Sequence, residues 1–146
     1  MPVFEATVQV SRSIADVFEF FARPANLLIV SPPELNLRLV EGPERLELGS
    51  RLVVQGRRWG IPQRIVSEVT AFEPVQRFVD EQREGPFARW IHNHLFETVV
   101  GGTQVTDRIE FDPPSGLLGL VMTASKIERD LGDVFAYRAR KLLELL

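Results

Sequence analysis

The sequence of 146 residues has no cysteine, two histidines, two tryptophans and one tyrosine. Without cysteine, the chain can form neither disulfide bonds nor thiolate metal sites. Basic residues are not in excess, since 17 lysines and arginines stand against 20 acidic residues and give a net charge of −3. Nucleic-acid-binding domains normally carry a basic patch, so the sequence argues against a nucleic-acid partner.

Long apolar segments are also missing. The longest strongly apolar run, Gly116 to Met122, is much shorter than the roughly 20 residues that cross a bilayer, so we expect no stable membrane insertion. The segment Met1–Glu5 lacks the basic and apolar regions of a signal peptide. We therefore expect a cytoplasmic protein, a monomer or homodimer, with a single domain over residues 1–146.

The N-terminal segment predicts one strand followed by one or two short helices. Apolar and polar residues alternate from Val3 to Val10, which indicates a half-buried strand. Ser11 or Ser13 can cap a following helix, and a second short helix can start at Pro24. The apolar residues of the first helix recur at helical spacing: Ile14, Val17, Phe18 and Phe21.

The middle of the chain reads as consecutive strands, which favours an antiparallel meander. The expected strands are Leu35–Val40, Arg51–Gly56, Gln63–Phe72, Arg77–Glu84, Phe87–Val100 and Thr103–Phe111. After the breaker at 112–116 we expect one long helix to the C-terminus. Its apolar stripe comprises Leu120, Ala124, Ile127, Leu131, Val134, Phe135, Leu142 and Leu145. The order predicts an α+β fold, in which a curved antiparallel sheet of six to seven strands wraps around the long helix.

Two strands joined near Gly101-Gly102 carry the most informative residues. If these glycines form the turn, Phe96 lies opposite Asp107, His94 opposite Ile109 and His92 opposite Phe111. One face then carries Trp90, His92, His94, Phe96, Val105, Asp107, Ile109 and Phe111. This face is apolar, yet it holds two imidazoles and a carboxylate, which are costly to bury without partners. We interpret it as the wall of a ligand cavity.

Three roles remain open for His92, His94 and Asp107. They can bond to one another and to buried water, recognise polar atoms of a ligand, or act in catalysis as acid and base. Two histidines and a carboxylate also match a facial iron site. Nothing else in the sequence supports a metal or a cofactor, and we expect neither.

The facing of Asp80 and Gln82 depends on two turns. A four-residue turn at 73–76 places Asp80 opposite Val69 and points both side chains inward. A two-residue turn at Gly85-Pro86 instead pairs Val79 with His92 and turns Asp80 outward. We favour the inward facing, because the neighbouring residues on that face are apolar.

Several stretches resemble the START/Bet v 1-like superfamily, also called SRPBCC, and its bacterial ligand-binding or polyketide-cyclase-like branch. The matching stretches are 22–27, 31–33, 85–87, 90–96, 101–103, 105–107, 117–119 and 135–138. The resemblance covers nearly the whole chain and implies a helix-grip fold, in which the sheet holds the C-terminal helix over a hydrophobic cavity. Because the superfamily hosts carriers, receptors and enzymes, it implies no catalytic residue for this chain.

The predicted function is binding of a hydrophobic or aromatic small molecule, lipid-, polyketide- or quinone-like, between the sheet and the C-terminal helix. The short helices and residues 112–119 would form the mouth. The candidate ligand-binding residues are Trp59, Ile65, Phe78, Asp80, Gln82, Trp90, His92, His94, Phe96, Asp107, Ile109 and Tyr137. One alternative is a cyclase or dehydratase with His92 or His94 as acid–base and Asp107 orienting the ring. Another is a partner-binding regulatory module.

Overall fold

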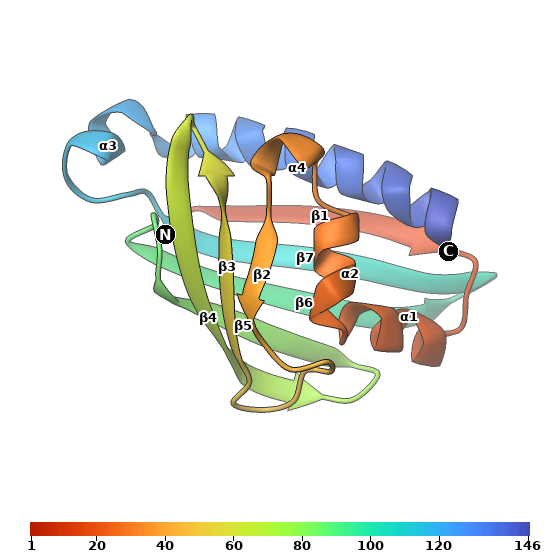
Figure 1. Cartoon of the computed structure of the whole chain (residues 1–146). Helices are drawn as coiled ribbons and strands as arrows, with labels where there is room; N and C mark the ends of the chain where they lie inside the picture. The colour runs from red at the N-terminus through yellow and green to blue at the C-terminus, as the bar shows by residue number, and fades with distance from the viewer.

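The structure, a computed structural model that describes residues 1–146, contains one antiparallel sheet and four α-helices (Figure 1). The strands are β1 (Val3–Val10), β2 (Arg38–Glu41), β3 (Arg51–Arg58), β4 (Ile61–Glu73), β5 (Arg77–Glu84), β6 (Arg89–Val99) and β7 (Gly102–Asp112). The helices are α1 (Ile14–Phe21), α2 (Pro24–Ile29), α3 (Gly116–Val121) and α4 (Ala124–Leu145), with a 3₁₀ turn, η1, at Pro33–Leu35. The predicted α+β class is confirmed.

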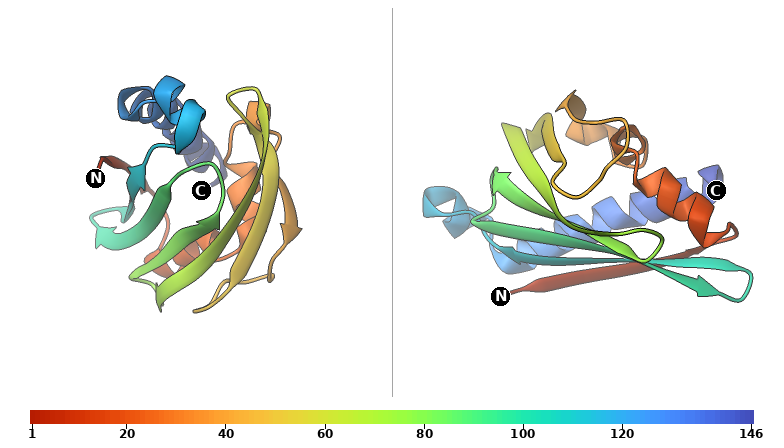
Figure 2. Two further views of the ribbon diagram at one scale, coloured as in Figure 1. Left: turned by 90° about the vertical axis from the view of Figure 1, so that its left-hand side faces the viewer. Right: turned by 90° about the horizontal axis from the view of Figure 1, so that it is seen from below.

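The seven strands form one sheet in the order β1-β7-β6-β5-β4-β3-β2. Figure 2 shows that the sheet curves strongly, so that its β2–β4 side turns towards α4. Helix α4 packs along β1, whereas α1 and α2 follow β1 in the chain, α1 packing against β6 and β7 and α2 against β2. As predicted, Ser13 caps α1, accepting a hydrogen bond from the amide of Asp16 at 3.2 Å.

The interior consists of two apolar clusters. The first joins α1 to the strands and is rich in aromatic rings: Phe18, Phe21, Phe78 and Phe96. The second lies under the N-terminal half of α4: Phe87, Ile109, Phe111, Ile127, Leu131 and Phe135. Polar residues separate the clusters on three elements: His92 and His94 on β6, Asp107 on β7 and Arg138 on α4. We call these four residues, together with Asp80 of β5, the polar band.

The β6–β7 hairpin differs from its predicted register by two residues. Val99 pairs with Gly102, so Val100 and Gly101 form the turn, and His94 lies opposite Asp107. Gly101 has a φ of 84°, as a tight turn requires. Gly102 serves a different purpose, because a Cβ there would collide with the carbonyl oxygen of Val10. A shift of two residues keeps every side chain on its predicted face but changes its partner.

The predicted long C-terminal helix is confirmed as α4, but its predicted start is wrong, because a separate short helix, α3, precedes it. Thr123 is the N-cap of α4 and accepts a hydrogen bond from the amide of Lys126 at 3.4 Å. Met122 has a non-helical ψ of 81° and ends α3. As a result Leu120, placed in the buried stripe by the sequence, is exposed, and so is Leu145 at the other end.

The facing of Asp80 follows from a bulge in β4. Phe78 pairs with Phe72 rather than with Ala71, because the turn has three residues instead of four. An irregularity between Val69 and Ala71 compensates, so Asp80 still lies opposite Val69, as predicted. The competing two-residue turn at Gly85-Pro86 is wrong, since Asp80 pairs with His92 across β5 and β6.

Candidate ligand cavity

A hollow of about 210 Å³ lies between the sheet, the α2–η1 segment and α4. Its walls are mostly aliphatic, with the polar band on one side. The lining residues are Pro24, Leu27, Leu28, Ser31, Leu35, Leu37, Leu39, Leu46, Leu52, Val54, Arg58, Ile65, Ser67, Phe78, Asp80, Trp90, His92, His94, Leu131, Val134, Phe135 and Arg138. No residue of the predicted mouth segment 112–119 is among them, because that segment leads into α3 instead.

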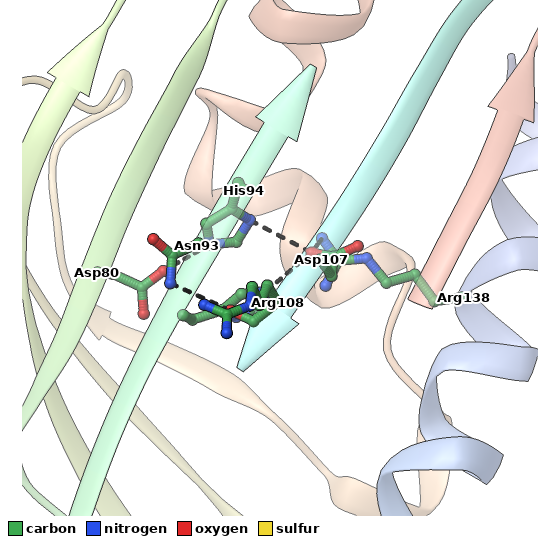
Figure 3. A network of polar contacts seen from close by, with 7 residues as sticks. Asp80, Asn93, His94, Asp107, Arg108 and Arg138 are labelled. Carbon is green, nitrogen blue, oxygen red and sulfur yellow. Dashed lines mark hydrogen bonds and ion pairs between the residues drawn. The ribbon is translucent and has the colours of Figure 1, made fainter. Parts of the chain in front are cut away.

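Two imidazole–carboxylate pairs form the centre of the polar band. Figure 3 shows Asp80, His94, Asp107 and Arg138 of this band. Nε2 of His92 lies 2.8 Å from Oδ1 of Asp107, and Nε2 of His94 lies 2.6 Å from Oδ2 of Asp80. Nδ1 of His94 is 3.5 Å from Asp107 Oδ1, across the strand pair in which these residues are directly opposed. The hydrogen bonds offset part of the cost of burying each group.

The two imidazole rings stack on each other. Their centroids are 3.7 Å apart with an interplanar angle of 19°, and Phe78 stacks on the other face of His94 at 4.1 Å. The stack extends the aromatic cluster of α1 and the strands into the polar band. It therefore fixes the orientation of both imidazoles by packing as well as by hydrogen bonding.

Arg138 enters the band from α4. Its guanidinium lies 5.1 Å from the ring centroids of Phe21 and Phe135, and Nη2 is 3.7 Å from Oδ1 of Asp107. The residue is only 9% exposed, and its Nε and Nη2 have no hydrogen-bond partner within the protein. These two nitrogens are enclosed, whereas Nη1 is not and also lacks a protein partner. Because Arg138 lines the cavity, Nη1 is the donor suited to an oxygen acceptor of a ligand.

Protonation in the band follows from burial and from neighbouring charges. Burial alone would raise the pKa of Asp107, but the charge of Arg138 and the hydrogen bond from His92 outweigh it, and the pKa lies below its ordinary value. The pKa of Asp80 is also lowered: the hydrogen bond from His94 and nearby positive charge outweigh burial. Burial and the neighbouring His92 lower the pKa of His94 to about 4.

The tautomers follow from these charges. An ionised carboxylate only accepts hydrogen bonds, so Nε2 of each histidine carries the proton and donates it to its aspartate. Nδ1 of His94 is enclosed without a partner, whereas Nδ1 of His92 also lacks a protein partner but is not enclosed. In neutral His92 this nitrogen is a free acceptor in a side chain that lines the cavity.

The residues that resemble a metal triad are Asp80, His92 and His94, whose ligand atoms lie within 4.8 Å of one another. A nitrogen lone pair lies in the plane of its ring, and these two planes are stacked 3.7 Å apart at 19°, so the lone pairs are poorly placed to converge on one metal ion. Both Nε2 atoms already bind carboxylates. The geometry fits a hydrogen-bonded cluster better than a metal centre, and the absence of a metal stays a prediction.

The predicted site residues divide into three groups. Those that line the cavity are Ile65, Phe78, Asp80, Trp90, His92 and His94. Asp107 lies behind the imidazoles and lines a small pocket between β1 and α4 with Arg138. The remaining predicted residues lie outside the cavity wall: Trp59, Gln82, Phe96, Ile109 and Tyr137.

Each residue outside the wall has another structural role. Phe96 and Ile109 fill the two apolar clusters, and Trp59 packs edge-on against Phe87 at 5.7 Å. Gln82 faces inward on its strand but donates to the carbonyl of Phe87 at 2.7 Å, closing the β5–β6 loop. The ring of Tyr137 lies beneath Arg140 at 5.9 Å, on a side of α4 turned away from the cavity.

Sequence reasoning missed Arg138, because it left this residue out of the buried stripe of the C-terminal helix. A signal was present, since Arg138 continues the buried stripe of α4 formed by Leu131, Phe135 and Leu142 at spacings of three and four. It also missed Arg58, which lines the cavity and is paired with Asp130 at 3.0 Å.

The comparisons with known proteins agree with this architecture. The protein TTHA0849 from Thermus thermophilus superposes with a TM-score of 0.75 at 15% identity, covering 99% of each chain. Major latex-like protein 151 from Panax ginseng gives a TM-score of 0.71 at 15% identity, covering 98% of this chain and 95% of its own. Ara h 8.0201 gives 0.65 at 14% identity, with 98% of both chains covered. At such identities these likenesses show the fold alone.

Sequence comparison adds the family. No curated protein matches the chain in a sequence search. None of the helices is long and apolar enough to cross a membrane. The family model described as "Polyketide cyclase / dehydrase and lipid transport" matches residues 1–144. The chain, with its helix-grip fold of the Bet v 1-like type, therefore belongs to the polyketide cyclase/dehydrase and lipid transport family.

Proposed function

We propose that the protein binds a hydrophobic or aromatic small molecule, lipid-, polyketide- or quinone-like, in the cavity between the sheet and α4. Membership of the family supports a hydrophobic ligand-binding module in general. The observation that carries the specific proposal is the cavity itself, about 210 Å³ with mainly aliphatic walls. A dry cavity of about 150 Å³ is known to accept benzene, so a bicyclic ring system is a realistic occupant here.

The proposal also assigns the polar band a role. Asp80, His92 and His94 line the cavity from the sheet, and Arg138 lines it from α4. Apolar walls supply most of the binding free energy, while a few fixed polar groups orient the ligand. Asp107 stands behind the imidazoles and holds them in place rather than touching the ligand.

A pair of tryptophan variants on β4 tests the location. Ile65 lines the cavity, whereas Ile61 on the same strand is exposed and does not. Ile65→Trp fills the cavity and should weaken binding of the neutral fluorophore N-phenyl-1-naphthylamine by at least about tenfold. Ile61→Trp makes the same chemical change outside and should leave its affinity unchanged. Equal affinities of both variants and the unchanged protein would place the binding site elsewhere.

One observation favours the rival function, an enzyme of the cyclase or dehydratase type. Asp107 orients His92 so that Nδ1, the free acceptor, belongs to a residue of the cavity wall. This arrangement of carboxylate, imidazole and open nitrogen is that of a general base. In an enzyme, His92→Gln would reduce turnover by about 10²-fold or more, whereas in a carrier it would change affinity only modestly. Fluorophore binding by the same variant separates the two outcomes.

A partner-binding module is the third candidate function. Helix α3 exposes Leu117, Leu120 and Val121, at 83%, 78% and 58%. Gel filtration of the purified protein, alone and with a host lysate fraction, measures any association. The carrier proposal predicts an elution volume that the lysate does not change.

A further inference from the structure

Three carboxylates and two guanidiniums surround the cavity. Arg58 is paired with Asp130, and Arg138 faces Asp107, so each guanidinium has one carboxylate. Asp80 is left as a third carboxylate, and its hydrogen-bond partner is His94. Because burial keeps the pKa of His94 far below neutrality, at about 4, that imidazole adds no positive charge.

Asp80 also has unused acceptor capacity. His94 occupies Oδ2, and no protein group donates a hydrogen bond to Oδ1. The side chain is 18% exposed and lines the cavity. Next to it on the wall, His92 presents its free Nδ1. The wall therefore offers acceptors at two points, while Arg138 brings a guanidinium whose Nη1 is not enclosed and has no acceptor within the protein.

We propose, resting on the ligand-binding function above, that the cavity selects apolar molecules whose polar head is a neutral hydroxyl, as in an alcohol or phenol, and rejects carboxylates. A hydroxyl donates to Asp80 or His92 while its oxygen accepts from Arg138, so both kinds of free group on the wall are used. Each of these contacts replaces a hydrogen bond that the free head group makes to water.

A carboxylate meets the opposite situation. It has no donor for Asp80 or His92, and it brings a second uncompensated negative charge into a largely apolar enclosure, where repulsion is weakly screened. An ammonium head compensates the charge of Asp80 but lies beside the guanidinium of Arg138. It also carries three donors that must lose their water. The neutral hydroxyl avoids both costs.

Three naphthalenes with the same ring and different heads test the selectivity at pH 7 by displacement of N-phenyl-1-naphthylamine. The compounds are 2-naphthalenemethanol, 2-naphthoate and 2-naphthylmethylamine. The alcohol should bind at least about tenfold more tightly than the carboxylate, and more tightly than the amine. A carboxylate or an amine that binds as tightly as the alcohol overturns the inference but leaves the ligand-binding function intact. If neither the fluorophore nor any naphthalene binds, the proposed function fails as well.

A variant pair identifies the source of the selectivity. Asp80→Asn removes the unpaired charge while its side-chain oxygen can still accept a hydrogen bond from His94. It should shift the ratio of carboxylate to alcohol affinity by about tenfold in favour of the carboxylate. Glu128→Gln removes the same charge from an exposed position on α4 and should leave the ratio unchanged. An unchanged ratio in folded Asp80→Asn contradicts the role of Asp80. If Asp80→Asn does not fold, the head-group series on the unchanged protein still decides.

Discussion

Phe96 and His94 are two residues apart on β6 and point to the same side of the sheet, yet they belong to different kinds of interior. Phe96 packs edge-on against Phe18 at 5.1 Å within an apolar cluster. His94 is also buried, but it is hydrogen-bonded to Asp80 and faces Asp107. The same change occurs on β7 between Val105 and Asp107, and on α4 between Leu142 and Arg138.

This contrast separates stability from function within one fold. Apolar clusters at both ends hold the sheet on α4 through burial, which depends little on pH. In the polar band between them, paired charged groups take the place of apolar side chains. Buried ion pairs contribute little to net stability, because the cost of removing the charges from water offsets their attraction. The band lies beside the cavity, so a role in ligand binding accounts for its polar residues better than a contribution to folding stability does.

The largest expected effect comes from removing the carboxylate shared by the band. Asp107→Ala leaves Arg138 without its nearest carboxylate and His92 without its acceptor, and should lower the free energy of unfolding by about 3–5 kcal/mol. Urea denaturation measures the loss. The double variant Asp107→Ala/Arg138→Met removes both charges and should be more stable than the single variant. If the double variant has the same free energy of unfolding as the single variant, the unpaired charge of Arg138 is not the cause of the loss.

The second expected effect is a dependence of folding stability on pH, which arises from the polar band and not from the apolar clusters. The folded pKa of His94 is about 4 and its unfolded value about 6.5, so the unfolded state takes up the proton first. Stability should therefore fall as pH decreases from 6.5 to 4, by up to about 3 kcal/mol. His94 is surrounded by Asp80, His92, Asp107 and Arg138. The lowered pKa values of both aspartates matter only below this window, where their contribution is also lost.

Replacing the titrating group checks this assignment. His94→Gln, measured by urea denaturation at several pH values, should show a flatter dependence between pH 6.5 and 4 than the unchanged protein. An equal slope in both proteins would assign the titration to another group.

A smaller effect is expected from the apolar side of the comparison. Ile109 lies two residues after Asp107 on β7 and is fully buried in the second apolar cluster. Ile109→Val should cost only about 1 kcal/mol, because one methylene is removed from a packed site. It should leave the pH dependence unchanged. A changed pH slope in this variant would show that the clusters and the band are not independent.

The smallest expected effect is that of added metal. Because the lone pairs of the two imidazoles lie in separate, stacked ring planes, Zn²⁺ or Fe²⁺ should leave the thermal midpoint unchanged. Differential scanning calorimetry with and without excess metal measures this directly. A rise of several degrees that His92→Gln abolishes would establish a metal site and overturn this interpretation.

The sequence predicted the faces of the strands better than the partners across them. Alternation assigns His92, His94 and Asp107 to the inner face of β6 and β7. An error of two residues in the predicted register leaves this assignment unchanged, because side chains alternate with a period of two. The register itself depended on Gly102, whose role is a close approach to Val10. That contact joins residues far apart in the chain, and no local pattern shows it.

Side chains near element ends were harder to place. Arg138 was left out of the predicted apolar stripe, because the helix dipole alone accounts for a cation near the end of a helix. In the structure it belongs to the buried face of α4. Tyr137 is adjacent in sequence but about 100° further round the helix, which turns it away from the cavity. Trp59 lies in a tight turn with a φ of 54°, a conformation that aromatic residues rarely adopt and that no pattern predicted.

The most direct test locates a bound ligand by NMR. Intermolecular NOEs between 2-naphthalenemethanol and this protein should connect the ring to the methyl groups of Ile65 and Leu52, and the hydroxymethyl protons to the ring protons of His92. NOEs confined to the exposed leucines of α3, Leu117 and Leu120, would contradict a site inside the cavity.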